Sequence, residues 1–304
     1  MRKSKFGTIL AFMTVLAFLA SGADAGCDYG ARAGPGLVWL ISSPVILDDS
    51  KENGPENDAE LDRPDCGSVV KITPEELCGI LEDERCVIAY VGNGHCDSYI
   101  EGSLLLPSKG FLRQDKTLKS IPDLTQTLGF AGISEDNILV TYSDCLSCGD
   151  PTFVSWIVAY LGHGDVRVLD GTRDDWIAAG LPMQKSPCVM TPVEYVPNPI
   201  PELLADYDFV VADRPQLVDA RIAADFAKGH IEGAVNLEYS RVMEGGRIKD
   251  CEGLAEVFVG LDKSLPVVVY SKRGGRASIV WFMLQEVGYD ARLYTWQDWL
   301  EHQE

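Results

Sequence analysis

Two cysteines three residues apart, Cys145 and Cys148, are the side chains of this chain best suited to covalent chemistry. Thiolates are strong nucleophiles, and C-x-x-C is a spacing typical of redox motifs. The pair lies in a segment that leads from an apolar run into a helix candidate, Tyr142–Thr152 (YSDCLSCGDPT). Free backbone N–H groups and the positive end of a helix dipole lower the pKa of a thiol placed there.

The residues around the two thiols fit a tight loop that enters a helix. Gly149 permits a sharp backbone curl, Pro151 fits the first helical turn, and Thr152 or Asp150 is expected to cap the helix. With Cys145 and Cys148 as catalytic residues, we expect the loop to supply the substrate-binding residues, which are Leu146, Ser147, Gly149, Asp150 and Thr152.

Short apolar runs alternate with helical stretches along the chain, and these elements must position the loop. The predicted buried strands are Val87–Val91, Ile138–Tyr142, Val166–Leu169, Leu217–Ala220, Val267–Tyr270 and Ala291–Tyr294. Helix candidates between them include Thr152–Leu161 and Ala277–Glu286. The alternation predicts an α/β fold with parallel sheets covered by helices on both faces, in which ligands bind at the carboxyl ends of strands.

Similar short motifs recur in the same order in the two halves of the chain. Ile100-Glu101-Gly102 is echoed by Ile231-Glu232-Gly233, Gly162 by Gly288, and Trp176 by Trp299. This indicates a duplicated domain with small insertions in its loops. The predicted divisions are residues 1–25 (signal peptide), 26–65 (N-terminal segment and linker), 66–186 (first domain), 187–201 (proline-rich linker) and 202–304 (second domain).

Several of these motifs resemble the rhodanese family. Asp219-Ala220-Arg221 followed by Gly229–Asn236 (GHIEGAVN) looks like the rhodanese signature near the start of that domain, and Tyr270–Ser278 (YSKRGGRAS) looks like its active-site loop. The resemblance covers roughly residues 66–304 and implies two tandem rhodanese-like domains. It also implies sulfurtransferase activity through a cysteine persulfide.

The chain departs from the family at the nucleophile. The family's catalytic cysteine usually stands in the second domain, where this chain has Ser271, and serine cannot carry a persulfide. Lys272, Arg273 and Arg276 remain in that loop, either as an anion pocket or as an exposed basic loop. Ser271 lies 17 residues before Gly288, and the same count back from Gly162 reaches Cys145. A one-turn error would point to Cys148 instead.

The resemblance implies an enzyme that moves sulfane sulfur from a small anionic donor, such as thiosulfate or polysulfide, to a thiol or cyanide-like acceptor. In this interpretation the Cys145 thiolate takes the outer sulfur of the donor, and Cys148 could afterwards resolve the persulfide. A thiol–disulfide redox protein using Cys145 and Cys148 is one alternative. The other is a non-catalytic envelope scaffold with degenerate rhodanese domains.

Composition and charge narrow the range of partners. The chain has 304 residues, 26 Lys+Arg and 46 Asp+Glu, and a formal net charge of −20, so nucleic acid is not expected as a partner. No cofactor is expected, and no metal site. The other cysteines of the body lack paired metal-ligand spacing; they are Cys66, Cys78, Cys86, Cys96, Cys188 and Cys251.

The N-terminus has the three parts of a secretory signal. Basic residues precede the uncharged run Phe6–Ala20, and Ser21–Cys27 (SGADAGC) follows. Ala23-Asp24-Ala25 fits cleavage before Gly26, whereas Ala25-Gly26-Cys27 resembles a lipoprotein signal. We favour lipidation of Cys27, which would attach the protein to a membrane. In either case the sequence predicts an extracytoplasmic protein, in the periplasm or cell envelope, where disulfides persist.

Overall fold

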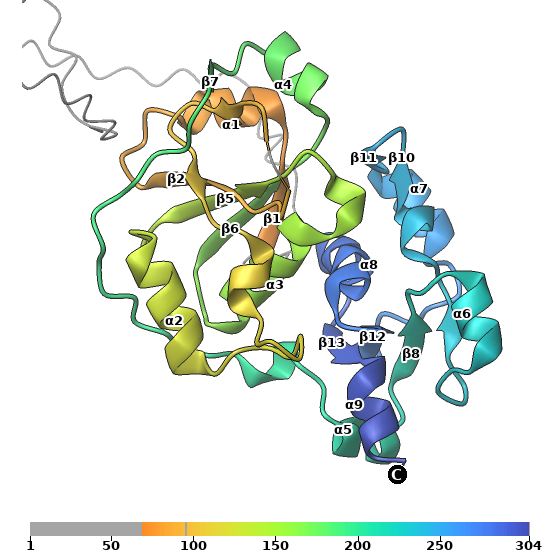
Figure 1. Ribbon diagram of the computed structural model, residues 1–304. Coiled ribbons are helices and arrows are strands. Elements are labelled where there is room, and N and C mark those ends of the chain that lie inside the picture. The colour runs from red at the N-terminus through yellow and green to blue at the C-terminus, as the bar shows by residue number, and fades with distance from the viewer. Residues whose placement is uncertain (1–68, 95, 304) are drawn as a thin grey trace, which may run out of the picture.

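The computed structural model describes residues 69–94 and 96–303. The signal segment, Cys27, Cys66 and His95 lie outside the described residues. The described part of the chain forms two main parallel sheets that lie side by side, and each sheet is packed against its own set of helices (Figure 1).

The first sheet contains the strand that leads into the cysteine loop. Within the described residues its order is β1-β6-β5-β2-β4, and all pairs are parallel. The strands are β1 (Val69–Ile72), β2 (Cys86–Tyr90), β4 (Leu104–Leu105), β5 (Ile138–Tyr142) and β6 (Asp165–Leu169). Every residue of β5 is buried, as expected for a central strand covered on both faces.

Alternate residues of these strands pack against different helices. Val87 and Ala89 of β2 belong to the core that includes α2 (Ile121–Phe130) and α3 (Asp150–Tyr160). Their neighbours Ile88 and Tyr90 pack on the other face, with α1 (Pro74–Ile80) and α4 (Arg173–Ala178). The two-residue period of a strand therefore supplies both layers of helices.

The second sheet repeats this plan with fewer residues. Its order is β13-β12-β8-β9 within the described chain, again parallel throughout. The strands are β8 (Gln216–Asp219), β9 (Val235–Asn236), β12 (Val267–Ser271) and β13 (Ala291–Thr295). One face packs on α7 (Cys251–Val257) and α8 (Gly275–Glu286), and the other on α5 (Tyr207–Ala212) and α9 (Trp296–Glu301).

Smaller elements complete the described chain. They are β3 (Tyr99–Ile100) paired with β7 (Met183–Gln184), β10 (Met243–Glu244) paired with β11 (Arg247–Ile248), α6 (Ala223–Lys228), and the 3-10 helices η1 (Ser108–Phe111), η2 (Leu146–Cys148), η3 (Pro201–Leu203) and η4 (Tyr239–Val242). No helix within residues 69–94 and 96–303 has the length and apolar character needed to span a bilayer.

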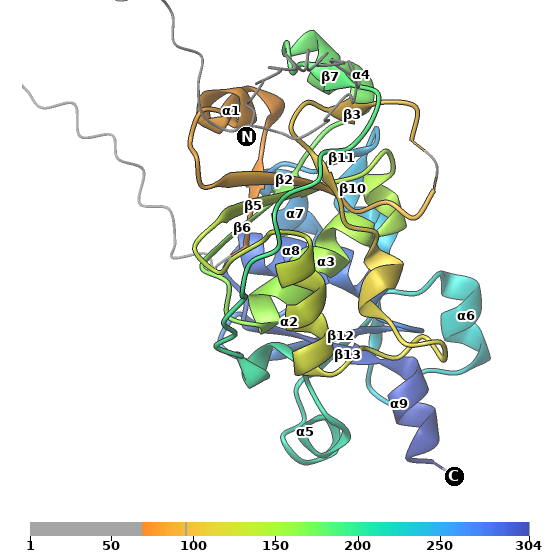
Figure 2. The same cartoon turned by 60° about the vertical axis from the view of Figure 1, so that its left-hand side comes forward.

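Helices α3 and α8 join the two sheets into one body. Both are nearly buried along their length and pack against each other between the sheets (Figures 1 and 2). A single apolar cluster runs from Val87 in the first sheet to Val269 in the second. The proline-rich connection lies along the first sheet's helices, where Asn198 N–H donates to Leu161 O and Ile200 N–H donates to Tyr160 O.

The sequence prediction of an α/β fold with parallel sheets and helices is confirmed. All six predicted strands occur within one residue of their expected ends, and the two helix candidates begin two residues earlier than expected. The sequence analysis did not identify β1, a four-residue strand at one edge of the first sheet. The two-residue strands β4 and β9 give no readable period either.

Candidate functional site

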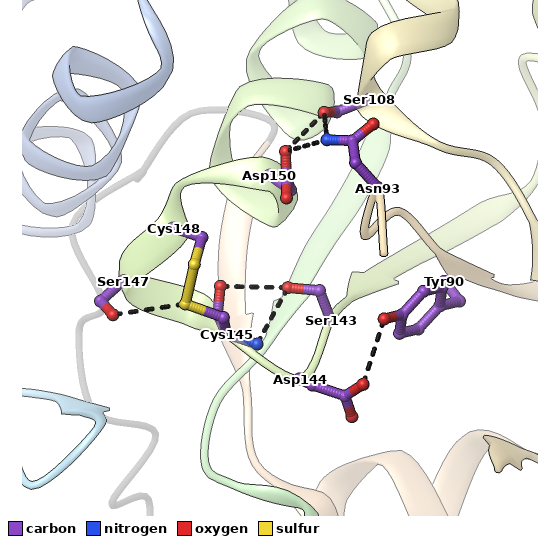
Figure 3. Close-up of a disulfide and its surroundings, with 9 residues drawn as sticks. All are labelled: Tyr90, Asn93, Ser108, Ser143, Asp144, Cys145, Ser147, Cys148 and Asp150. Atoms are coloured by element: carbon purple, nitrogen blue, oxygen red, sulfur yellow. Dashed lines mark hydrogen bonds between the residues drawn. A yellow bond between two sulfur atoms is a disulfide. The ribbon is translucent and has the colours of Figure 1, made fainter. Parts of the chain in front are cut away.

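Cys145 and Cys148 form a disulfide at the carboxyl end of β5, and this bond is the centre of the candidate site (Figure 3). Helix η2 bends the chain so that Cys148 N–H donates to Cys145 O at 3.1 Å, with the two Cα atoms 5.3 Å apart. Cys148 is exposed and Cys145 is half-buried, so both sulfurs lie near solvent. Nucleophilic chemistry at either sulfur requires reduction of the bond first.

The strand anchors the near side of the loop through Tyr142 and Ser143. The hydroxyl of Tyr142 accepts from Ile100 N–H at 2.9 Å and donates to Ser103 Oγ at 2.9 Å. Ser143 Oγ donates to Cys145 O at 3.1 Å and accepts from Cys145 N–H at 3.4 Å. These bonds hold the backbone of Cys145, while Ser147 Oγ lies 3.6 Å from its sulfur.

Asp144, next to Cys145, connects the loop to a polar cluster under α4. Its carboxylate accepts from Tyr90 Oη at 3.1 Å and forms an ion pair with Arg173 at 2.5 Å. Arg173 Nη2 also lies 3.1 Å from Cys96 Sγ, whose pKa is raised, chiefly by burial. The cation nearest the disulfide loop in this cluster is therefore already neutralised by Asp144.

Asp150, the first residue of α3, fixes the far side of the loop. Its Oδ1 accepts from Ser108 Oγ at 2.5 Å and from Asn93 Nδ2 at 2.8 Å, and Asn93 Oδ1 accepts from Lys109 N–H at 2.9 Å. In Figure 3 the carboxyl group points toward Ser108 and Asn93 rather than toward the disulfide. Burial raises the pKa of Asp150, against the lowering effect of these two hydrogen bonds.

The N-terminal end of α3 packs directly against the N-terminal end of α8. Gly149 has φ +86° and its Cα faces the carbonyl of Gly275, with no room for a Cβ between them. One turn later the buried hydroxyls of Thr152 and Ser278 lie 2.9 Å apart. Each of these hydroxyls also donates to the carbonyl three residues before it, Gly149 O and Gly275 O. The N-terminal turns of α3 and α8 therefore match residue by residue, with Gly149 at the position of Gly275 and Thr152 at that of Ser278.

The second loop has a serine, Ser271, at the position that corresponds to the predicted nucleophile, and the hydrogen bond of this serine can be compared with the first loop. Ser271 ends β12, is 3% exposed, and its Oγ accepts from Ala277 N–H at 3.1 Å. Ala277 stands two residues after Gly275, and the residue two after Gly149 is Pro151. Proline has no N–H, so the amide that reaches Ser271 has no counterpart in the first loop.

The basic residues of the second loop lie apart from the disulfide. Lys272 and Arg273 are exposed and line a cavity of about 470 Å³ whose lining includes Phe153 and Trp156 of α3 but neither cysteine. The guanidinium of Arg276 stacks over Tyr239 at 4.8 Å from the ring centre. Cations therefore gather beside Ser271, whereas the cysteine loop carries carboxylates.

The predicted site residues lie together in one loop and the helix turn that follows it, but their side chains point in different directions, some toward solvent and some into the core. Ser147 faces solvent beside Cys145, whereas Leu146 is 5% exposed and packs into the core. Pro151 does lie in the first turn and Gly149 does provide the curl. The expectation that Thr152 or Asp150 caps α3 was wrong: Gly149 is the N-cap, because the Thr152 hydroxyl points to Ser278 and Asp150 is already helical.

The sequence missed the polar residues that hold the loop. Tyr90, Asn93, Ser108 and Arg173 come from segments far away in the chain, and no spacing rule links them to the cysteines. One signal was readable: the 126-residue offset between Gly162 and Gly288 pairs Pro151 with Ala277. Across the described residues, no group of three His, Cys, Asp or Glu side chains is arranged to hold a metal ion.

Comparisons with known proteins agree with this architecture. Residues 203–301 match the family described as the rhodanese-like domain. A Haloferax volcanii protein, whose name gives thiosulfate sulfurtransferase as a provisional activity, is 27% identical over 218 residues, covering 61% of this chain and 75% of that protein. The thiosulfate sulfurtransferase of Corynebacterium glutamicum is 29% identical over 198 residues, covering 55% of this chain and 65% of that protein.

Solved structures share the fold. SseA from Escherichia coli, described as a 3-mercaptopyruvate sulfotransferase with the rhodanese fold, aligns with a TM-score of 0.65 and 19% identity over 74% of this chain and 97% of that one. Wild-type EanB aligns with a TM-score of 0.69 and 18% identity over 77% of this chain and 68% of that one. Together these comparisons show a rhodanese-like domain match over residues 203–301, similarity to thiosulfate sulfurtransferase-like relatives, and a rhodanese fold.

Proposed function

We propose that this protein is an exported sulfurtransferase built from two tandem rhodanese-like domains, of which the first carries the nucleophile, Cys145. The names of the relatives support sulfur transfer as the reaction class. The observation that carries the assignment to Cys145 is the Cys145–Cys148 pair at the carboxyl end of β5, in which Cys145 is half-buried and Cys148 exposed, opposite a second loop with Ser271 in place of a thiol.

Matching positions in the two sheets support the proposal of two tandem domains. Tyr142 is the last residue of β5 and Tyr270 the last but one of β12. The hydroxyls of both accept a backbone N–H from an isoleucine, Ile100 at 2.9 Å and Ile231 at 3.1 Å. Export rests on the N-terminal signal pattern, with lipidation of Cys27 as our preferred form of attachment.

The proposed reaction begins from the reduced pair. The Cys145 thiolate attacks the outer sulfur of thiosulfate, the S–S bond of the donor breaks, and sulfite leaves with its electron pair. Cys145 then carries a persulfide, and a thiol or cyanide acceptor removes the outer sulfur and regenerates the thiolate. Ser147 Oγ, 3.6 Å from Cys145 Sγ, and the loop backbone are the groups placed to contact the donor.

The test is a single-turnover assay on the reduced protein. With cyanide present as the acceptor, thiosulfate should release one sulfite per chain and yield one thiocyanate. In Cys148→Ser without an acceptor, one extra sulfur should remain on a peptide containing Cys145. Cys145→Ser should release no sulfite. Ser271→Ala is the matched control and should behave like the wild type; a loss as large as that of Cys145→Ser would place catalysis in the second loop.

Thiol–disulfide exchange is the second candidate, and the closed Cys145–Cys148 bond favours it. In that case no sulfur donor modifies either cysteine, yet the pair cycles between dithiol and disulfide with a dithiol reductant. Sulfur found on Cys148 instead of Cys145 would exchange their roles. If neither thiol reacts with a sulfur donor or a dithiol reductant, only the hypothesis of a non-catalytic envelope scaffold remains.

A further inference from the structure

The placement of Cys148 implies a specific fate for a persulfide on Cys145. Helix η2 brings Cys148 onto the inner sulfur of Cys145, since this is the atom to which Cys148 is bonded in the disulfide. The outer sulfur of a persulfide is a leaving group on that same atom. Attack by Cys148 therefore needs no movement of the loop beyond that of the two side chains.

The surroundings of Cys145 stabilise an anionic persulfide poorly. Pro151 stands where the second loop has the Ala277 N–H that donates to Ser271, so the corresponding donor is missing. Asp144, next to Cys145 in the chain, forms an ion pair with the Arg173 guanidinium, so this cation is not free to pair with a persulfide anion. Conversion to an uncharged disulfide removes the negative charge that this site stabilises poorly.

We propose that Cys148 resolves the Cys145 persulfide, so that the protein delivers its sulfur as hydrosulfide and ends each turnover as the disulfide. This inference rests on the proposed sulfur transfer to Cys145. It assigns the protein a second activity, reductive release of sulfane sulfur, and requires a dithiol reductant as a co-substrate.

The step balances without any other reactant. Cys145–S–S⁻ and Cys148–SH give the Cys145–S–S–Cys148 disulfide and HS⁻: the bond between the inner and outer sulfurs breaks, the Sγ–Sγ bond forms, and the thiol proton leaves on the outer sulfur. Two electrons pass from the two cysteine sulfurs to the outer sulfur. A dithiol reductant then restores the two thiols and becomes a disulfide itself.

The experiment compares the reduced wild type, Cys148→Ser and Cys251→Ser, each mixed with one equivalent of thiosulfate under anaerobic conditions without an acceptor. Sulfite, sulfide and intact mass are followed over time. The wild type should release sulfite and then an equal amount of sulfide, and should finish as the disulfide. Cys148→Ser should release sulfite without sulfide and keep its extra sulfur at least about tenfold longer.

Cys251→Ser is the matched control, because Cys251 is an exposed free cysteine in α7, outside the site. It should release sulfide like the wild type. Sulfite release with an equally stable persulfide in the wild type and Cys148→Ser would overturn the resolving role and leave sulfur transfer intact. If no variant releases sulfite or gains sulfur, the proposed function fails, and the resolving role fails with it.

Discussion

At the scale of single residues, the two loops divide the requirements of a persulfide site between them. The first has the thiols, Cys145 and Cys148, but Pro151 removes an amide donor. The second has the amide, from Ala277, and exposed cations, but Ser271 is no substitute for a thiol. Glycine spacing aligns the two loops and predicts Cys145 as the nucleophile from the sequence alone, whereas the electrostatic difference between the loops emerges only from the hydrogen bonds.

The buried carboxyl group of Asp150 predicts a dependence of protein stability on pH. Burial raises its pKa in the folded protein above the ordinary value of about 3.9. Ionising this carboxyl therefore costs more in the folded than in the unfolded chain, and its contribution to stability falls as the pH rises from about 4 toward neutral. Asp150→Asn keeps an acceptor for Ser108 but cannot ionise.

The expected result is a difference in unfolding free energy, variant minus wild type, that shifts in favour of Asp150→Asn as the pH rises. Chemical denaturation of both proteins at several pH values between about 4 and 7 measures it. A difference that stays constant over this range would mean that the folded and unfolded pKa values of Asp150 are equal.

At the scale of elements, all strands of four or five residues in the two parallel sheets except β1 could be predicted from the sequence, and the two-residue strands could not. Ile138–Tyr142 and Val267–Ser271 are continuous apolar runs because both faces of a parallel sheet are covered. The two-residue strands β4 and β9 are held by their partners rather than by their own pattern. The cap of α3 was missed for a related reason, since contact with α8 determines where Thr152 points.

Gly149 allows a prediction at this scale. An alanine there would adopt φ +86° and would also push its methyl group into the Gly275 carbonyl. Gly180 has nearly the same backbone, φ +85°, with no atom within 4 Å of an added Cβ. We expect Gly180→Ala to cost about 1 kcal/mol from backbone strain alone, and Gly149→Ala about 2–4 kcal/mol. Denaturant midpoints measure both, and equal costs would show that α3 and α8 separate readily at their N-terminal ends.

At the scale of the whole molecule, the N-terminal signal makes a prediction about processing. The mature protein should begin at Gly26 or at a lipidated Cys27, because a basic start, an uncharged 15-residue run and a small-residue boundary match the plan of a signal peptide. Cell fractionation with mass analysis of the N-terminal peptide measures this. An intact Met1 in a soluble cytosolic fraction would contradict export and would leave the Cys145–Cys148 bond without an oxidising compartment.

The contact between Gly149 and Gly275 also determines how such a chain can change over generations. When a gene segment is copied in tandem, one copy is normally free to accumulate substitutions while the other keeps the activity. If the two halves of this chain arose as such copies, the half without a thiol is also the surface against which the thiol-bearing loop packs, including the contact between the hydroxyls of Thr152 and Ser278. Selection on the first loop is therefore also selection on the second, and a lineage that deleted the second half would lose the shape of the first.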